Sequence, residues 1–404
     1  MSVEYWIWLQ QVLGYSHESV SRVLANYDTA KQFYLAPDEE KIKVCRLNKT
    51  QISRLHSIPK KLVYKIMKDA HDNGIDIITP EDKQYPERLL NIPDFPAVLY
   101  CKGNHFEIND TPVITIVGPR KISDYGVKCA YVIANTLASC GFTVVSGCAL
   151  GGDSAAHKGA IDAGGKTIGV LGCGIENGYL KVNSELKNNI SKNGALISEY
   201  PPFCNVLKGA FPRRNRILSA LSNGVVVIEG SQKSGTMITA KYAVEQGKDL
   251  FVIPGSPSLE QYQGSNRLIA DGAMPLLNIN DIINEYVFLY PEKIHLPKEK
   301  NNVDERVNDI KKANLPIIEK KIESKSTDST EKRKIAPPDK AILSNEAAIV
   351  LKCFEQFDDS DDSFVTDDAV DNTGLSVSEV LSAVTELEIC GFIEAIVGGR
   401  YRLK

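Results

Sequence analysis

The chain has 404 residues, of which 43% are hydrophobic and 24% are charged, and its formal net charge is -4. This length predicts about two to four domains with at least one full hydrophobic core. No apolar run approaches the roughly 20 residues of a membrane-spanning helix. No basic leader precedes an apolar stretch at the N-terminus, so we expect a cytoplasmic protein without a membrane partner.

Cysteines and histidines give no sign of a metal site. The nine cysteines are scattered without a CxxC pair, and several lie in or beside apolar runs, which is typical of buried free thiols. The six histidines form no cluster with the spacing of metal ligands. We therefore expect neither disulfides nor a bound metal.

The N-terminal part of the chain predicts a small helical domain. From Tyr5 to about residue 80, apolar residues recur at helical spacing and are interrupted by short breaks such as GYSHES and LAPDEE. Residues 81–111, which contain YPERLLNIPDFPAVLYCKGN, are rich in proline and aromatic residues. We expect this second segment to be an irregular connector.

Residues 112–295 show the alternation of strands and helices that defines an α/β fold. Short β-branched or apolar runs are separated mostly by helix-length segments. These runs are VITIVG, FTVVSG, TIGVLG, ALISEY, GVVVIEG and DLFVIPG. Runs that are apolar on both faces predict a doubly wound, extended Rossmann-like parallel sheet with right-handed crossovers. Ligands bind such sheets beyond the carboxyl ends of the strands, which is where the glycine-rich turns lie.

The C-terminal part divides into a linker and a small domain. Residues 296–340 are charged, poor in aromatic residues and closed by two prolines, which predicts a flexible linker. Residues 341–404 contain two helical patterns joined by a turn with Gly374, and they end in a hairpin around Gly398 and Gly399. This order predicts a winged helix.

Three strand ends carry loops that suit an anion. GPRKISDYG (118–126), SGCALGGDSAAHKGA (146–160) and GSQKSGTMITA (230–240) each place small residues at the start of a helix, where the dipole favours negative charge. Residues 209–224, GAFPRRNRILSALSNG, add three closely spaced arginines and an aromatic residue without nearby acids. Together these segments predict a track for several phosphates.

Other interpretations of the motifs find less support. LGCGIENG follows a strand, but Asn177 stands where a dinucleotide-binding GxGxxG motif needs glycine. His157 lies four residues after Asp153 and could face it across one helical turn, although helix packing or a local hydrogen bond explains it as well. No nucleophile elbow and no carboxylate cluster for magnesium is present, so we expect no catalytic residue and no cofactor.

Seven motifs in order resemble the DNA-processing protein family DprA/Smf. They are GPRKISDYG, SGCALGGDSAAHKGA, GGKTIGVLGCGIENGYLKVN, ISEYPP, FPRRNRILSALS, VVVIEGSQKSGTMITAKYAVEQGKDLFVIPG and SNRLIADGA. The resemblance implies a protein that binds and protects single-stranded DNA during natural transformation and loads the RecA recombinase on it. It further implies a SAM/HhH-like helical domain over 1–80 and a homodimer formed through the Rossmann-like domain.

The resemblance also implies a set of DNA contacts. They are Gly118, Arg120, Ser146, Gly147, Lys208, Phe211, Arg214, Asn215, Arg216, Lys233, Ser234 and Gly235. Arg213 occupies a variable position and is expected to be solvated. Two residues depart from the family pattern: Leu150 stands where a basic residue is usual, and Leu180 replaces a proline.

The sequence also speaks against two rival functions. Nucleoside-monophosphate phosphoribohydrolases share the sheet, but Thr239 stands at the position of their catalytic glutamate and cannot act as a carboxylate base. A transcription regulator led by the winged helix would need a basic surface. Residues 341–404 carry instead four basic and thirteen acidic residues, a net charge of -9, which repels phosphate.

Overall fold

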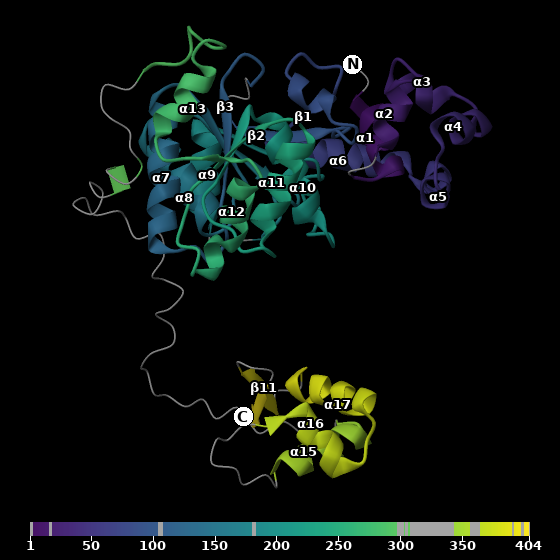
Figure 1. Ribbon diagram of the computed structural model, residues 1–404. Coiled ribbons are helices and arrows are strands. Elements are labelled where there is room, and N and C mark those ends of the chain that lie inside the picture. The colour runs from purple at the N-terminus through teal and green to yellow at the C-terminus, as the bar shows by residue number, and fades with distance from the viewer. Residues whose placement is uncertain are drawn as a thin grey trace. The chain divides into compact units, whose positions relative to one another are not determined.

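The computed structural model of this chain divides into two compact units, residues 1–320 and 321–404. It describes residues 3–15, 18–103, 108–179, 183–296, 303, 306–307, 343–355, 364–389, 392–396 and 400–403. The predicted linker, 296–340, and Leu180 therefore fall almost wholly outside the described residues. Figure 1 shows the first unit from purple to green and the second in yellow.

Six helices form the N-terminal region, as the apolar spacing predicts. They are α1 (Val3–Leu13), α2 (Ser19–Leu24), α3 (Ala30–Leu35), α4 (Asp38–Cys45), α5 (Lys49–Ser57) and α6 (Lys60–Asp72). The sequence marks several helix starts: Thr29 caps α3, and Asn48 forms a capping box with Gln51 at the start of α5. Helix α1 also contacts the sheet, since Gln10 donates to the backbone oxygens of Val98 and Glu199.

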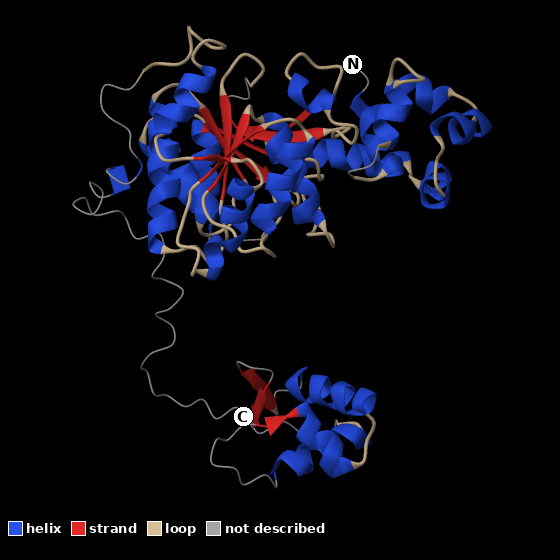
Figure 2. Ribbon diagram, viewed as in Figure 1, coloured by secondary structure: helices blue, strands red, loops and turns tan. Residues whose placement is uncertain are grey.

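A nine-stranded sheet forms the centre of the first unit, with helices around it (Figure 2). Its order is β1-β2-β6-β5-β4-β3-β7-β8-β9. The six predicted runs form β3 (Val113–Val117), β4 (Thr143–Ser146), β5 (Thr167–Leu171), β6 (Gly194–Ser198), β7 (Gly224–Val227) and β8 (Asp249–Val252). All six pair in parallel, which confirms the predicted α/β class.

The sheet extends beyond these six strands at both edges. Strand β2 (Leu99–Gly103) pairs antiparallel with β6 and with β1 (Asp76–Ile78), and β9 (Met274–Pro275) lies parallel to β8. The segment predicted to be an irregular connector thus contains a strand as well as the 3-10 helix η1 (Glu87–Asn91). The unpaired edge of β6 supplies the hydrogen bonds that make 99–103 extended, and local composition does not reveal such a partner.

Two hydrophobic cores cover the two faces of the sheet. Along β3, Ile114 and Ile116 pack into one core, and Val113 and Val117 into the other. The first core includes α7 (Asp124–Ser139), α8 (Gly152–Asp162) and α13 (Ile279–Tyr286), and the second includes α10 (Ala210–Leu221) and α11 (Gly235–Glu245). Helices α9 (Ser184–Asn193) and α12 (Glu260–Ala270) complete the set described in this unit.

The strand order reverses between β3 and β7. From β3 the chain proceeds through β4, β5 and β6 on one side, then returns through α10 to β7 on the other side of β3. Loops that diverge at such a reversal leave a crevice at the carboxyl ends of the strands. This crevice is the place to look for a ligand site.

The second unit has its own small core. It contains α15 (Asn345–Glu355), β10 (Phe364–Val365), α16 (Thr366–Thr373), α17 (Val377–Ile389), β11 (Ile393–Ile396) and β12 (Arg400–Leu403). The strands form an antiparallel sheet in the order β10-β12-β11. Val350, Phe354 and Leu387 are among the buried residues of the core. The winged-helix assignment itself stays a prediction.

Two features are absent from the described part of the chain. No described helix is both long enough and apolar enough to cross a membrane. The described residues also include no group of three or more histidine, cysteine, aspartate or glutamate side chains placed to hold a metal ion.

Candidate nucleic-acid interface

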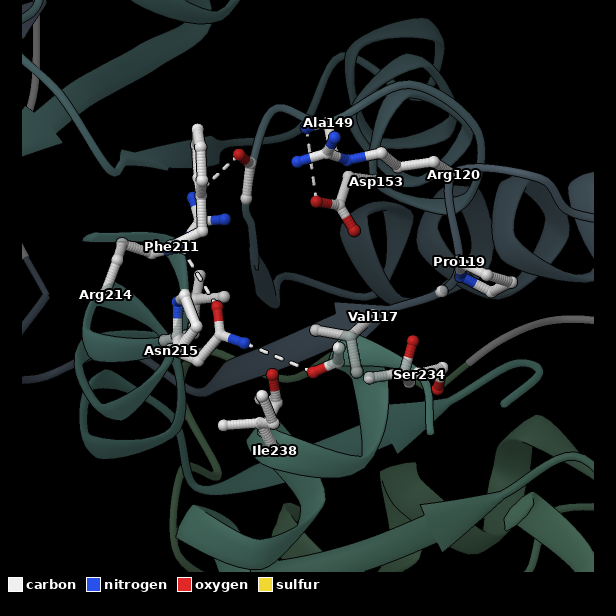
Figure 3. Close-up of a pocket in the computed structure, with 17 residues that line it drawn as sticks. Val117, Pro119, Arg120, Ala149, Asp153, Phe211, Arg214, Asn215, Ser234 and Ile238 are labelled. Carbon is white, nitrogen blue, oxygen red and sulfur yellow. Dashed lines mark hydrogen bonds between the residues drawn. The ribbon is translucent and has the colours of Figure 1, made fainter. Parts of the chain in front are cut away.

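A cavity of about 360 Å³ lies at the crevice between β3 and β7, and we call it the switch-point cavity. It is lined by Val117, Gly118, Pro119, Arg120, Gly147, Ala149, Asp153, Phe211, Pro212, Arg214, Asn215, Leu218, Ser234, Gly235, Thr236, Ile238 and Thr239. Figure 3 shows Arg120 and Asp153 on one side and Phe211, Arg214 and Asn215 from α10 on the other. All three loops predicted from the sequence meet here.

The loop after β3 is held in place by a buried carboxylate. Glu229, which is fully buried, accepts hydrogen bonds from the backbone N–H of Ser123 at 3.1 Å and from the Tyr262 hydroxyl at 2.8 Å. The Ser123 hydroxyl also donates to Glu229, and Ser123 caps α7 by accepting from Gly126. Glu229 thereby fixes the segment that carries Arg120 at the mouth of the cavity.

The loop after β4 forms the floor of the cavity. The Ser146 hydroxyl is buried and donates to the Ile116 carbonyl at 2.7 Å, so the structure gives this predicted contact residue a structural bond. The Gly147 carbonyl accepts from Arg214 Nη1 at 2.7 Å. A side chain at position 147 has no room, because a Cβ there would lie 2.6 Å from the Arg214 guanidinium.

Arg214 and Asp153 are the buried charges of the cavity. The Arg214 side chain lies at the cavity wall, and the residue is only 5% exposed. Burial lowers the pKa of Arg214, and the negative charge of Asp153 opposes that change. Burial likewise raises the pKa of Asp153, against the effect of Arg214 and of hydrogen bonds such as that from the Ala149 N–H. Arg214 is thus a cation that is fixed before any ligand arrives.

Phe211 and Arg120 form the aromatic part of the site. The Arg120 guanidinium carbon lies 5.4 Å from the Phe211 ring centroid, and the Tyr179 ring centroid lies 5.1 Å away on a tilted plane. Gly172 leaves the space in which the Phe211 ring packs, because a Cβ there would lie 2.8 Å from that ring. Phe211 is half-buried, so part of its ring remains open to a ligand.

The loop after β7 adds an unused hydroxyl group. Ser234 and Gly235 start α11 at the cavity wall, and Asn215 donates to the Gly235 carbonyl at 3.3 Å. The Ser234 hydroxyl is buried and makes no hydrogen bond with any described residue. A polar atom in that condition usually has a ligand or a water as its partner.

Ser146 is not the only predicted contact residue outside the described cavity lining. Lys208, Arg216 and Lys233 also lie outside it. Lys208 and Lys233 are exposed. Arg216 is fully buried, and its guanidinium forms ion pairs with Glu199 at 2.7 Å and with Asp94 at 2.9 Å. The expected contact of Arg216 with a phosphate stays a prediction, and in this structure the hydrogen-bonding groups of the guanidinium already have partners inside the protein.

His157 does not join a catalytic group. It is fully buried, its Nδ1 lies 2.7 Å from the Thr167 hydroxyl, and its Nε2 lies 3.7 Å from the Cys148 sulfur. Sequence reasoning left helix packing open for this residue, and the structure shows that packing.

Sequence reasoning does not identify several residues that lie in the cavity or beside it. The sequence suggests helix capping or a contact with His157 for Asp153, and it suggests no role for Tyr179. Leu218 follows Arg214 by one helical turn, so helical periodicity alone could have placed it on the same face. Tyr179 reaches Phe211 only through folding, and no local signal points to it.

The close approach of two loops at the cavity allows a test by a single methyl group. A Cβ on Gly152 would lie 2.7 Å from the Gly118 Cα, so Gly152→Ala must push apart the loops that follow β3 and β4. We expect a loss of about 1–3 kcal/mol in the free energy of unfolding and weaker ligand binding. Denaturant titration measures the free energy of unfolding.

Gly235→Ala is the matched control, because position 235 also begins a helix and a Cβ there meets nothing within 4 Å. We expect its stability to stay near wild type. Equal stability of the two variants would contradict the close packing of the loops.

The fold and the cavity define an α/β protein whose switch point suits a ligand that carries phosphate. The chain belongs to the family of DNA recombination-mediator protein A, whose family model matches residues 76–287. This is a family of DNA-binding recombination mediators and not of enzymes.

Similar proteins share this assignment. Protein Smf of Synechocystis sp. is 30% identical over 98% of both chains, and DNA processing protein DprA of Bacillus subtilis is 38% identical over 55% of this chain and 74% of its own. The X-ray structure of DNA processing protein A from Streptococcus pneumoniae matches with a TM-score of 0.63 and 30% identity, covering 70% of this chain and 98% of that one.

Proposed function

We propose that this protein binds single-stranded DNA in the switch-point cavity. The observation that carries the proposal is the half-open Phe211 ring beside the exposed Arg120, at the mouth of a cavity with a buried cation at its wall. Single strands are held without regard to sequence by a cationic path for the backbone and by aromatic rings on which bases stack. Phe211 supplies the stacking surface, and Arg120 and Arg214 supply the charge.

The finer steps of the function rest on the family motifs. We propose that the bound strand is protected and passed to the RecA recombinase during DNA uptake. We also propose a homodimer through residues 112–295. The rate of RecA nucleation on a single strand, with and without the protein, is the readout for the loading step.

The phosphoribohydrolase alternative finds no chemical support at the cavity. Thr239 lines the wall and is 1% exposed, so the position of a catalytic glutamate holds a buried hydroxyl. Asp153 is the one carboxylate among the described lining residues, and the Ala149 N–H and Arg214 constrain it. A general base needs a carboxylate within reach of the proton that it removes.

Binding to a short single strand tests the proposed function. We expect single-stranded DNA to bind more tightly than duplex of the same length, with an affinity that falls steeply as salt rises. Phe211→Ala should weaken binding by about 1–3 kcal/mol with nearly unchanged salt dependence, because it removes stacking and no charge. Arg120→Gln should reduce the slope of log K against log salt by about 0.7, the share of one phosphate.

Phe203→Ala is the control for the aromatic variant, because Phe203 is 53% exposed and does not line the cavity. It should bind as wild type does. Fluorescence anisotropy with a labelled oligonucleotide gives all of these affinities. Equal affinity of the wild type for duplex and single strand would contradict the proposal.

A further inference from the structure

A second cavity, of about 450 Å³, lies between the helical region and the start of α10. It is lined by Gln11, Leu13, Gly14, Tyr15, Asn48, Thr50, Gln51, Arg54, Ile58, Leu207 and Arg213. None of the family motifs quoted above accounts for the part of its wall that comes from α1 and α5. We call it the helical-side cavity.

The charge of the helical-side cavity is wholly positive among its described lining residues. Arg54 and Arg213 are the ionised groups, and no aspartate or glutamate lines it. Neither arginine forms an ion pair with a described residue, although the whole chain carries a net negative charge. Two half-buried cations without acidic partners repel each other, and an anion between them removes that repulsion.

The walls of the helical-side cavity are fixed by hydrogen bonds. Gln51 donates to the Leu13 carbonyl at 3.0 Å and closes the capping box of α5 with Asn48. Gly14 has a φ of 82°, and a Cβ there would lie 3.0 Å from Arg54 Nη1, so this glycine leaves room for the guanidinium. Arg213 donates through Nη2 to the Lys208 carbonyl at 2.7 Å. The Arg213 guanidinium is therefore held in position, and the Arg54 guanidinium has room beside Gly14.

The segment 207–215 borders both cavities. Leu207 and Arg213 line the helical-side cavity, while Phe211 and Arg214 line the switch-point cavity. Neighbouring residues of an α-helix point about 100° apart, which sends Arg213 and Arg214 to different sides of α10. The exposed Lys208 lies in the same segment, before Arg213 in the chain, and adds a third cation.

We propose that the helical-side cavity is a second phosphate subsite, in which Arg54 and Arg213 bind the backbone of the same DNA strand that enters the switch-point cavity. The proposal rests on the proposed function. A strand that leaves Phe211 passes Lys208 and reaches Arg213 and then Arg54. The N-terminal helical region thus takes part directly in holding DNA, and the length of strand that the protein covers increases.

The test compares oligonucleotides of increasing length, from about 4 to about 16 nucleotides. We expect Arg54→Gln/Arg213→Gln to bind the shortest strand as wild type does. The same double variant should bind the longest strand about tenfold more weakly, with a slope of log K against log salt reduced by about 1.4, the share of two phosphates. Lys65→Gln/Lys241→Gln removes two exposed cations outside both cavities and serves as the control.

A second variant avoids removing the arginines. Thr50 is exposed, lines the helical-side cavity and occupies the first turn of α5, where an acidic side chain suits the helix dipole. Thr50→Asp should therefore leave the melting temperature at or above the wild-type value and weaken binding of the long strand only. Loss of affinity by this variant cannot come from misfolding if its melting temperature is retained.

Several outcomes would overturn the inference. Equal loss of affinity for short and long strands, or no greater loss than in the control, would remove the helical-side cavity from the DNA path. If inorganic phosphate binds to the wild type and not to Arg54→Gln/Arg213→Gln, while the length dependence is unchanged, the cavity takes a free anion and not the strand. Failure of the wild type to bind any oligonucleotide would instead contradict the proposed function itself.

Discussion

Replacing Arg216 by methionine is expected to lower the free energy of unfolding by about 3–5 kcal/mol, because it leaves a buried charge without its partner. Arg216 donates to both carboxylate oxygens of Glu199, at 2.7 and 3.1 Å, and Glu199 is only 1% exposed. Burial alone would lower the pKa of Arg216, but Glu199 and Asp94 raise it above its ordinary value. Arg216 therefore stays charged inside the protein and depends on these carboxylate partners.

Denaturant titration measures this loss. Arg213→Met on the same helix is the control; its half-buried side chain forms no ion pair with a described residue, and we expect a change within about 0.5 kcal/mol. Arg216→Met/Glu199→Leu removes both charges and should recover most of the stability.

The alternative for Arg216 is a direct contact with DNA. In that case Arg216→Met would fold as stably as wild type and would bind single-stranded DNA with a flatter salt dependence. Measuring both quantities on the same preparation separates the two roles. If Arg216→Met leaves the free energy of unfolding unchanged, Arg216 is a DNA-contact residue and not a residue that stabilises the fold.

Acid is expected to destabilise the protein strongly through His157. Burial, together with the nearby charge of Arg214, lowers the pKa of His157 from 6.5 to about 3. Below pH 6.5 the unfolded chain therefore binds a proton at this residue, and the folded protein does not until the pH approaches 3. The free energy of unfolding falls by about 1.4 kcal/mol for each pH unit in that window, and this contribution is fully present above pH 6.5.

Unfolding titrations at pH 7 and at pH 4.5 test this expectation. His157→Asn removes the titrating group and keeps a polar atom near the Thr167 hydroxyl. Between pH 7 and pH 4.5, the free energy of unfolding should therefore fall by about 2–3 kcal/mol less in this variant than in the wild type. His71→Asn removes an exposed histidine and serves as the control, because it shows whether the loss of any imidazole reduces the pH dependence of stability. A wild type and a His157→Asn variant with parallel pH profiles would show that His157 is protonated in the folded state.

The parallel sheet could be predicted from the sequence because its signals are local. Strands buried on both faces appear as continuous β-branched runs, and helices of ordinary length separate most of them. The edge strands at 76–78 and 99–103 could not be predicted in this way. Both are short. Residues 99–103 are extended because β6 offers an unpaired edge, and residues 76–78 pair in turn with 99–103.

The candidate site was predictable in outline and not in its division of roles. Gly118, Arg120, Phe211, Arg214 and Gly235 follow from glycine-rich loops, the arginine cluster and the family motifs, and the structure brings them to one cavity. Charge in the sequence does not show which arginines remain free. Arg216 is satisfied by Asp94, which lies 122 residues away in the chain.

By itself, the sequence determined the α/β class, the six central strands and the three loops that meet at the switch point, because each depends on neighbouring residues. Only the tertiary structure decided where the side chains of Arg213, Arg214 and Arg216 lie and what they contact. One helix sends the three side chains in different directions: toward the helical-side cavity, toward the switch-point cavity and into the core. Helical geometry separates them, but the burial and the charge of distant segments determine which arginine can bind a ligand and which one stabilises the fold.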